Sequence, residues 1–241
     1  DMQRELDIMP SSTRKRAYDL ALSMDTNFVQ DRRFRLRYLR GHRFNAKAAA
    51  KYFVGYFWAT QTLFDDSALT KPWSYDMLNE DDIACLENGD LQVLPSRDQS
   101  GRAVLCKAVK HEAYKTIGNA IRAAGYLIYK AFEDEETQKR GMVFIAYHGD
   151  MKIPTFDPAI MSAAMDLAAG MPCAFSGIHF CYESPLLRPF AFIHRRILPE
   201  HLRPVCRDHE GSHMECMYNL MTFGIPTGDI PVKEDGSLCR K

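Results

Sequence analysis

The 241-residue sequence predicts an α/β protein in which a helical module, residues 1–80, precedes a domain with a mostly parallel sheet, residues 85–232. Two observations predict this class. In the first part, apolar side chains recur at three- and four-residue steps, as they do along one side of a helix. From residue 91, short apolar runs alternate with helical stretches, and strands joined by connections of that length pair in parallel. A polar tail, residues 233–241, follows the domain.

Within the module, the stretch FRLRYLRGHRFNAKAAAKYFVGYFWA (34–59) predicts two helices joined at Gly41. Asn45 stands at the N-cap position of the second helix, and Asp65 begins the segment that closes it. The second helix is expected to face a core with Ala49, Phe53, Tyr56, Phe57, Thr60 and Phe64.

The first helix of this pair is expected to share an apolar side formed by Val29, Leu36 and Leu39. The opposite side then carries several arginines, which are either solvated or turned toward a membrane. These arginines are Arg33, Arg37 and Arg40.

Strands and helices alternate in the second part of the chain. The run GMVFIAY is continuously apolar, as expected of a strand that is covered on both faces. Asp157 and Pro158 mark the start of a helix that Gly170 ends. Strands are expected at 103–109, 141–147, 178–182 and 203–207, and helices at 117–132, 158–170, 184–198 and 213–221.

Composition narrows the function classes. The 31 basic and 31 acidic side chains cancel, so we expect no nucleic-acid partner. The seven cysteines are scattered without a CxxC pair, which is typical of a reduced, intracellular protein. No apolar run approaches the ~20 residues that span a bilayer, and no signal peptide is visible. We therefore expect a cytoplasmic protein.

One enzyme-like pattern occurs at HEGSH, which fits the HExxH string of zinc proteases. That chemistry needs His209 and His213 on one face of a helix. However, Ser212 and Glu215 form a better capping box, so the helix is expected to begin after Ser212 and to leave His209 in the preceding loop. Two flanking cysteines leave a structural zinc site as the alternative. Our interpretation is that neither a metal nor a cofactor is bound.

Other catalytic signatures are absent from the sequence. It has no GxGxxG, no GxxxxGK[ST] and no GxSxG, so we do not predict an enzyme. His148 precedes Gly149 at a strand end, where a hydrogen-bonding histidine in a turn is expected more readily than a catalytic base. His179 and Cys181 share one sheet face, either packed under a helix or touching a ligand.

The segment SPLLRPFAFIHRRIL (184–198) predicts an amphipathic helix with a basic edge. Such a helix can cover an apolar cavity while its cationic edge meets anionic head groups, or it can simply pack on a sheet. The apolar side consists of Leu186, Leu187, Phe190, Ile193, Ile197 and Leu198, and the positive charge comes from Arg188, His194, Arg195 and Arg196.

From about residue 25 to 232, the chain resembles the CRAL-TRIO lipid-binding family. FRLRYLRGHRFNAKAAAKYF is similar to the family's Leu-Arg-Phe-Leu-Arg-Ala-Arg-Lys-Phe-Asp motif and the alanine-rich helix after it. GRAVLCKAV is similar to its Gly-Arg-Pro-Val strand, and GMVFIAYHGD to its central strand. The segment that ends in SPLLRPFAFIHRRIL is similar to the region of its mobile gate helix.

The resemblance implies a non-catalytic carrier that encloses one lipophilic molecule between the sheet and the gate helix. Cys173-Ala174 stands where phosphatidylinositol-binding members carry Glu-Arg, so that head-group site is not transferred. The ligand is then expected to be another phospholipid, an isoprenoid- or sterol-like molecule or a fatty acyl compound. We expect a pocket lined by Val143, Ile145, Tyr147, Ile178, Phe180, Tyr182, Leu186, Phe190, Ile193 and Ile197.

We expect the basic side chains of Arg188, Arg195 and Arg196 to face a membrane that includes anionic lipids, with the protein peripherally associated. A scaffold of the same fold that transfers nothing is the alternative hypothesis. A zinc enzyme is a third, and it depends on HEGSH alone.

Overall fold

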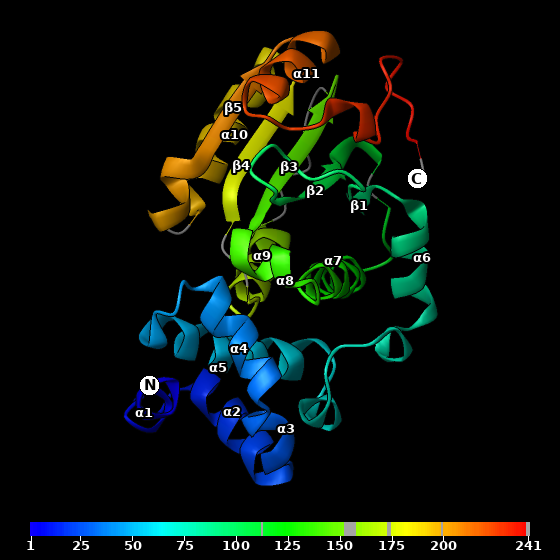
Figure 1. Cartoon of the computed structure of the whole chain (residues 1–241). Helices are drawn as coiled ribbons and strands as arrows, with labels where there is room; N and C mark the ends of the chain where they lie inside the picture. The colour runs from blue at the N-terminus through cyan, green and yellow to red at the C-terminus, as the bar shows by residue number, and fades with distance from the viewer. Residues whose placement is uncertain (112, 152–157, 173–174, 199, 240–241) are drawn as a thin grey trace. The chain divides into compact units, whose positions relative to one another are not determined.

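The structure is a computed structural model, and it describes residues 1–111, 113–151, 158–172, 175–198 and 200–239. The chain forms two compact units (Figure 1). The helical unit comprises Asp1–Ile83, Lys115–Lys139 and Ala159–Ala174, and the sheet unit comprises Ala84–Tyr114, Arg140–Pro158 and Phe175–Lys241.

Local capping side chains begin the helices of the helical unit. Ser12, Asp25, Asp31 and Asn45 each accept a hydrogen bond from a backbone N–H of the first turn, so the expected N-cap at Asn45 is confirmed. The helices are α1 (Met2–Asp7), α2 (Thr13–Met24), α3 (Thr26–Gln30), α4 (Arg32–Gly41), α5 (Ala46–Leu63), η1 (Asp66–Thr70), η2 (Tyr75–Met77), α6 (Glu80–Asn88), α7 (Ile117–Ala131), α8 (Glu135–Arg140) and α9 (Pro158–Ala168). Of these, α6, α8 and α9 each include at least one residue that is assigned to the sheet unit.

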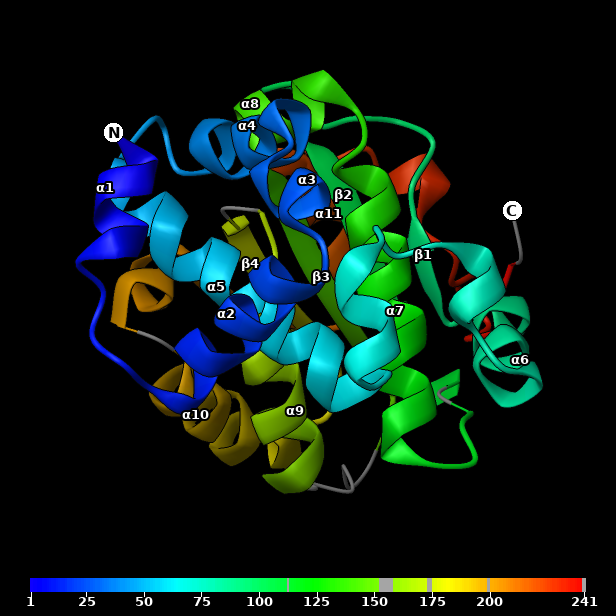
Figure 2. The ribbon, with the colours of Figure 1, turned by 90° about the horizontal axis from the view of Figure 1, so that it is seen from below.

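An aromatic core surrounds α5, which packs against α1, α2 and α4 (Figure 2). The expected apolar side with Val29, Leu36 and Leu39 is wrong, because the chain breaks at Asp31 and α4 buries Phe34 instead. Rings in edge-to-face contact are favoured beyond their burial alone, so the aromatic side of α4 turns inward. The core rings are Tyr18, Phe34, Tyr38, Phe53, Tyr56, Phe57, Trp73 and Tyr129.

Two of the arginines on α4 are bound within the helical unit. The guanidinium of Arg37 lies over the ring of Tyr129, 5.4 Å from its centroid. Arg40 forms an ion pair with Glu135 at 3.0 Å and donates to Gln138 at 3.1 Å. At these two positions, α4 therefore presents neither a fully solvated face nor a face turned toward a membrane.

Two glycines allow backbones to touch in the helical unit. A Cβ on Gly55 of α5 would lie 2.2 Å from the carbonyl oxygen of Ala169, and a Cβ on Gly170 would lie 2.6 Å from the carbonyl oxygen of Gly55. Tyr38 donates its hydroxyl to the carbonyl of Gly170 at 3.0 Å. The segment after α9 is therefore fixed against α5 through main-chain atoms, which cannot move aside as a side chain can.

We expect Gly55→Ala to lower the free energy of unfolding of the helical unit by about 2 kcal/mol, because the overpacking cost exceeds the gain in helix propensity. Urea unfolding followed by tryptophan fluorescence measures this, since Trp58 and Trp73 both belong to this unit. Gly118→Ala in α7 is the control, because the nearest atom to its Cβ, in the guanidinium of Arg122, would still lie 3.3 Å away. Equal stability of both variants would contradict the close approach.

The sheet unit contains a five-stranded sheet in the order β1-β2-β3-β4-β5. Strands β2 to β5 run parallel, and β1 pairs antiparallel with β2. The mostly parallel sheet predicted from the sequence is thus present. The remaining elements of this unit are β1 (Leu91–Val93), β2 (Ala103–Ala108), η3 (Val109–His111), β3 (Met142–Gly149), β4 (Phe175–Tyr182), η4 (Pro185–Leu187), α10 (Arg188–Ile197), η5 (Glu200–Val205), β5 (Cys206–Glu210), α11 (His213–Thr222) and η6 (Thr227–Asp229).

Strand β5 begins three residues later than the sequence indicated. Residues 203–205 belong to η5, which contains Pro204, and the strand runs over Cys206–Glu210. Proline cannot donate to a sheet ladder, which excludes it from the paired part of the strand. The expected helix 184–198 is likewise divided into η4 and α10. The expected cap at Asp157 lies outside the described residues.

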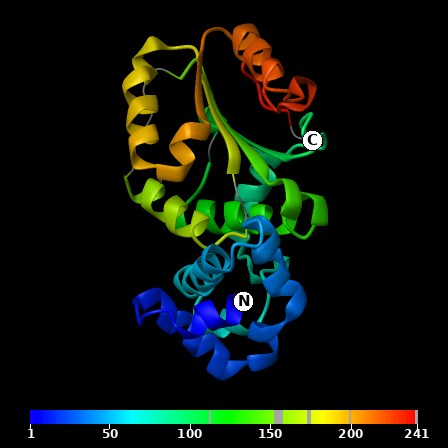
Figure 3. The same cartoon turned by 60° about the vertical axis from the view of Figure 1, so that its left-hand side comes forward.

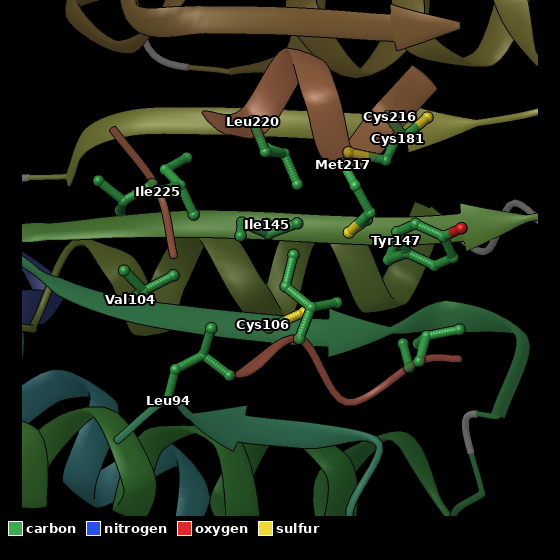
Figure 4. Packing of buried hydrophobic residues seen from close by; sticks show 14 residues of the cluster. Leu94, Val104, Cys106, Ile145, Tyr147, Cys181, Cys216, Met217, Leu220 and Ile225 are labelled. Atoms are coloured by element: carbon green, nitrogen blue, oxygen red, sulfur yellow. The ribbon is translucent and has the colours of Figure 1, made fainter. Parts of the chain in front are cut away.

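One face of the sheet is closed by α11 and the C-terminal segment (Figure 4). Met217 and Leu220 reach from α11 toward β3, and Ile225 packs beside them. Burial of these side chains, each stabilising by roughly 1.5–3 kcal/mol, holds the helix on the sheet. The cluster consists of Leu94, Val104, Cys106, Ala108, Val143, Ile145, Tyr147, Cys181, Cys216, Met217, Leu220, Ile225, Ile230 and Val232.

Candidate ligand-binding site

The opposite face of the sheet carries α10 (Figure 3). Side chains alternate between the two faces of a strand, and directly paired residues of parallel strands share a face. Phe144 pairs with Ile178, and Ala146 pairs with Phe180, so these residues form the floor beneath α10. On β5 the same face presents Asp208 and Glu210.

Two ion pairs hold α10 to the edge strand β5, and we call them the α10 latch. Arg188 donates two hydrogen bonds to the carboxylate of Glu210, from Nε to Oε2 at 2.5 Å and from Nη2 to Oε1 at 2.7 Å. Arg195 binds Asp208 at 2.6 Å. The hydrogen bonds from Arg188 hold the pKa of the Glu210 carboxyl below its ordinary value. Two of the arginines that we expected to face a membrane are therefore paired with carboxylates of the protein.

His194 attaches the middle of α10 to the floor. Its ring stacks on that of Phe180 with a centroid distance of 5.4 Å and an angle of 11° between the planes. Burial lowers the pKa of His194, although Asp208 partly opposes this effect. His194 is thus neutral at pH 7 and adds no charge to the basic edge, contrary to the expectation from the sequence.

Large apolar side chains of the α10 region face solvent. Leu186 is 65% exposed, Phe192 is 59% exposed and Ile193 is 40% exposed. The guanidinium of Arg196 lies over the ring of Phe192 at 5.0 Å. The helix therefore presents apolar surface beside cationic groups, while Ala191 is buried on its inner side.

The structure divides the residues expected to line the pocket between several environments. Ile178, Phe180 and Tyr182 are buried on β4, and the pairing of Tyr182 with Glu210 places it with the α10 side. Phe190 is half-buried on α10, and the side chain of Ile197 lies outside the described residues. Val143, Ile145 and Tyr147 belong to the cluster under α11 on the other face, and Leu186 and Ile193 point to solvent.

A hollow of about 120 Å³ lies at the carboxyl ends of β2, β3 and β4. Parallel sheets commonly bind ligands at this edge. Aliphatic and polar groups line it, and none of them comes from the described side chains of α10. The lining comprises Ala108, His111, Tyr147, His148, Gly149, Asp150, Glu183, Val232, Lys233, Glu234, Asp235 and Gly236.

His148 borders this hollow and differs from its expected role. It lies within β3 rather than in a turn, it is 8% exposed, and its Nδ1 has no hydrogen-bond partner among the described residues. Burial, with smaller contributions from His194 and Lys107, lowers its pKa to about 4. At neutral pH the ring is therefore uncharged.

The HEGSH string is divided between a strand and a helix. His209 lies in β5, not in a loop, and Ser212 and Glu215 form the expected capping box at the start of α11. His209 instead meets His179 of β4, with His179 Nδ1 and His209 Nε2 2.8 Å apart and the rings stacked. Across the described part of the chain, no group of three or more histidine, cysteine or carboxylate residues is placed to hold a metal ion.

His179 packs under a helix, which is one of the two interpretations that its alternation with Cys181 left open. Phe223, which follows α11, contacts both histidine rings, so the pair packs under the helix. The α10 latch and the stack on Phe180 were not foreseen. The available signal is the alternation of Asp208 and Glu210 along a strand, but the strand predicted at 203–207 ends before both residues.

Comparison with known proteins assigns no family to the chain. No helix in the described ranges is long and apolar enough to cross a membrane. No family model matches the chain, and no curated protein matches it. The crystal structure of Sfh5 superimposes with a TM-score of 0.49 and 10% sequence identity, covering 86% of this chain and 68% of that one. Similarity at this level assigns neither a family nor a function.

Proposed function

We propose that the chain binds a lipophilic small molecule between the sheet and α10 and presents or transfers it at membranes. The observation that carries the proposal is the way in which α10 lies on the sheet. The helix covers an apolar floor, turns Phe192 and Ile193 outward and is held at its edge by ion pairs, and Leu186 of the preceding η4 is exposed as well. The resemblance of the sequence to the CRAL-TRIO family supports the same function.

The closed arrangement must open before a lipid can enter. The hollow of about 120 Å³ is smaller than the roughly 300–1,000 Å³ typical of sites for drug-sized ligands. Displacing α10 would uncover Ile178 and Phe180, and burial of a lipid tail there gains about 0.8 kcal/mol per methylene. Contact of Phe192 and Ile193 with a bilayer offsets the loss of the contacts that α10 makes with the sheet.

The cargo that we propose is a phospholipid, an isoprenoid- or sterol-like molecule or a fatty acyl compound. The membrane partner includes anionic lipids, because Arg188, Arg195 and Arg196 occupy the edge of the same helix. We propose no catalytic step and no cofactor. Cys173-Ala174, the replacement because of which the inositol head-group site is not transferred to this chain, lies outside the described residues.

The transfer of a fluorescent lipid between vesicles tests the role of the outward side of α10. We expect Ile193→Asp to reduce the transfer rate about tenfold, because a carboxylate is costly to place in an apolar interface. Ile193 is 40% exposed, so the fold should tolerate the change. Met221→Asp on α11, at a site that is 57% exposed, is the matched control and should transfer at the normal rate.

A scaffold function is the second candidate, and a specific observation favours it. Met214, Tyr218 and Met221 form an exposed apolar stripe on α11 at spacings of four and three residues. On the scaffold hypothesis, Met221→Asp abolishes partner binding while Ile193→Asp has no effect on any activity. That result would contradict the carrier function.

A further inference from the structure

A buried histidine at the end of the central strand has an unused hydrogen-bonding atom. His148 is 8% exposed, and its Nδ1 makes no hydrogen bond to the residues that the structure describes. A buried polar atom without a partner destabilises a protein, so its presence calls for an explanation. A ligand that bonds to Nδ1 supplies one.

His148 belongs to the side of the sheet that carries α10. Ala146, two residues earlier on β3, pairs with Phe180 of the floor, but the register with β4 shifts between Tyr147 and Gly149, so the neighbours of the ring decide its side. The charged or polar neighbours that influence its ring are Lys107, which pairs with Ala146, and His194 of α10. Tyr147, the residue between, bonds to His213 at 2.7 Å on the α11 side.

The surroundings of His148 change from apolar to polar along the strand. Toward the amino end, the floor is formed by Ala146, Ile178 and Phe180. At the carboxyl end, the hollow brings four carboxylate side chains and one lysine around the strand ends. These groups are Asp150, Glu183, Glu234, Asp235 and Lys233. An anionic head group at the carboxyl ends of the strands would meet net negative charge.

The ring itself is uncharged at neutral pH, because burial lowers its pKa to about 4. A neutral imidazole offers one N–H donor and one acceptor nitrogen. It therefore suits a hydroxyl or carbonyl group better than a phosphate or carboxylate, which prefers a cationic partner.

We propose that His148 hydrogen-bonds the polar end of the ligand and that this end is uncharged, as in a long-chain alcohol, a sterol or a lipid carbonyl. This inference rests on the proposed lipid-carrier function. It narrows the cargo to lipophiles with a neutral polar tip, whose tail lies along the floor and whose tip lies beside the hollow.

Three pyrene probes with the same twelve-carbon chain test the inference: pyrenedodecanol, dodecylpyrene and pyrenedodecanoic acid. We expect the full chain to bind the alcohol at least fivefold more tightly than the hydrocarbon or the acid, which is the effect of one buried hydrogen bond. His148→Phe keeps a ring but removes both nitrogens, so it should reduce the preference for the alcohol over the hydrocarbon to less than twofold. His148→Asn retains a polar group near the position of Nδ1 and should restore part of the preference.

Binding of dodecylpyrene at the same affinity shows that a variant has kept its fold. His179→Phe, on the other face of the sheet, is the control for loss of any buried histidine and should keep the preference. If the wild type binds alcohol and hydrocarbon equally, or if His148→Phe keeps the preference, the inference is wrong and the carrier function stands. If none of the probes binds, the carrier function and the inference fail together.

Discussion

Removal of the two carboxylates of the α10 latch is expected to strengthen binding to anionic vesicles at least tenfold. In the double variant Asp208→Asn with Glu210→Gln, Arg188 and Arg195 lose their protein partners. Each arginine then becomes available to lipid phosphates, and a basic residue near an anionic surface contributes about 1 kcal/mol. Two such residues together give more than a tenfold change.

The complementary variant distinguishes competition from simple loosening of the helix. Arg188→Gln with Arg195→Gln breaks the same two ion pairs but removes the positive charge. We expect it to weaken binding to vesicles containing phosphatidylserine at least tenfold. Co-sedimentation at two salt concentrations measures both effects, which should shrink as salt rises because of screening.

The essential result is that the two double variants change vesicle binding in opposite directions. Arg14→Gln is a useful control, because Arg14 also forms an exposed ion pair, with Asp166, but lies in the helical unit. It should leave vesicle binding unchanged. If both double variants shift binding in the same direction, the arginines of α10 do not exchange carboxylates for lipid, and the latch has no role at a membrane.

Acidification from pH 6.5 to pH 4 is expected to destabilise the sheet unit by several kcal/mol. Burial, then His209, lowers the pKa of His179 to about 4, and burial lowers that of His148 to about 4. Burial also lowers the pKa of His209. In the unfolded chain these histidines take up protons near pH 6.5, while the folded chain resists protonation.

The direction of the change in stability follows from the difference in histidine pKa between the folded and the unfolded chain. Because the unfolded state binds more protons below pH 6.5, the free energy of unfolding falls as the pH falls, and it levels off near pH 4. Lowering the pKa from 6.5 to about 4 corresponds to a loss of about 3 kcal/mol in the free energy of unfolding for each of His179 and His148. Proteins have a total free energy of unfolding of ~5–15 kcal/mol, so a loss of this size leaves the sheet unit weakened or unfolded near pH 4.

Hydrogen exchange of peptides from β4 and β5, corrected for the intrinsic rate at each pH, measures this loss. Tryptophan fluorescence does not report it, because both tryptophans belong to the helical unit. His179→Leu should give a shallower dependence on pH, since one of the responsible groups is gone. Protection in β4 that stays constant between pH 6.5 and pH 4.5 would contradict the burial of neutral histidines.

Capping residues and continuous apolar runs could be read from the sequence because their signals are local. Asn45 and the Ser212–Glu215 box mark helix starts through bonds within one turn. The run around Val143 predicts a buried strand for the same reason. The face to which each of its side chains points could not be read, because a strand covered on both faces shows no alternation. The sequence therefore predicts a single pocket for Phe180 together with Val143, Ile145 and Tyr147, whereas the register places Phe180 on the other face.

The contacts that define the candidate site join segments far apart in the chain. His179 meets His209 only because β4 and β5 pair in one particular register. The ion pair between Arg188 and Glu210 depends on that register and on where η5 gives way to β5. The apolar outward side of α10 was visible as a pattern, but which side meets the sheet depends on the position of Phe180 beneath His194.

The most direct test of the carrier function is the mass of the intact protein under native conditions, measured after purification and again after incubation with lipid vesicles. We expect a species heavier than the polypeptide by one lipophilic molecule, which organic solvent extracts and which the wild type passes on to acceptor vesicles. A protein that keeps the mass of the bare polypeptide after both treatments, with its fold intact, would contradict the proposal that α10 covers a lipid site.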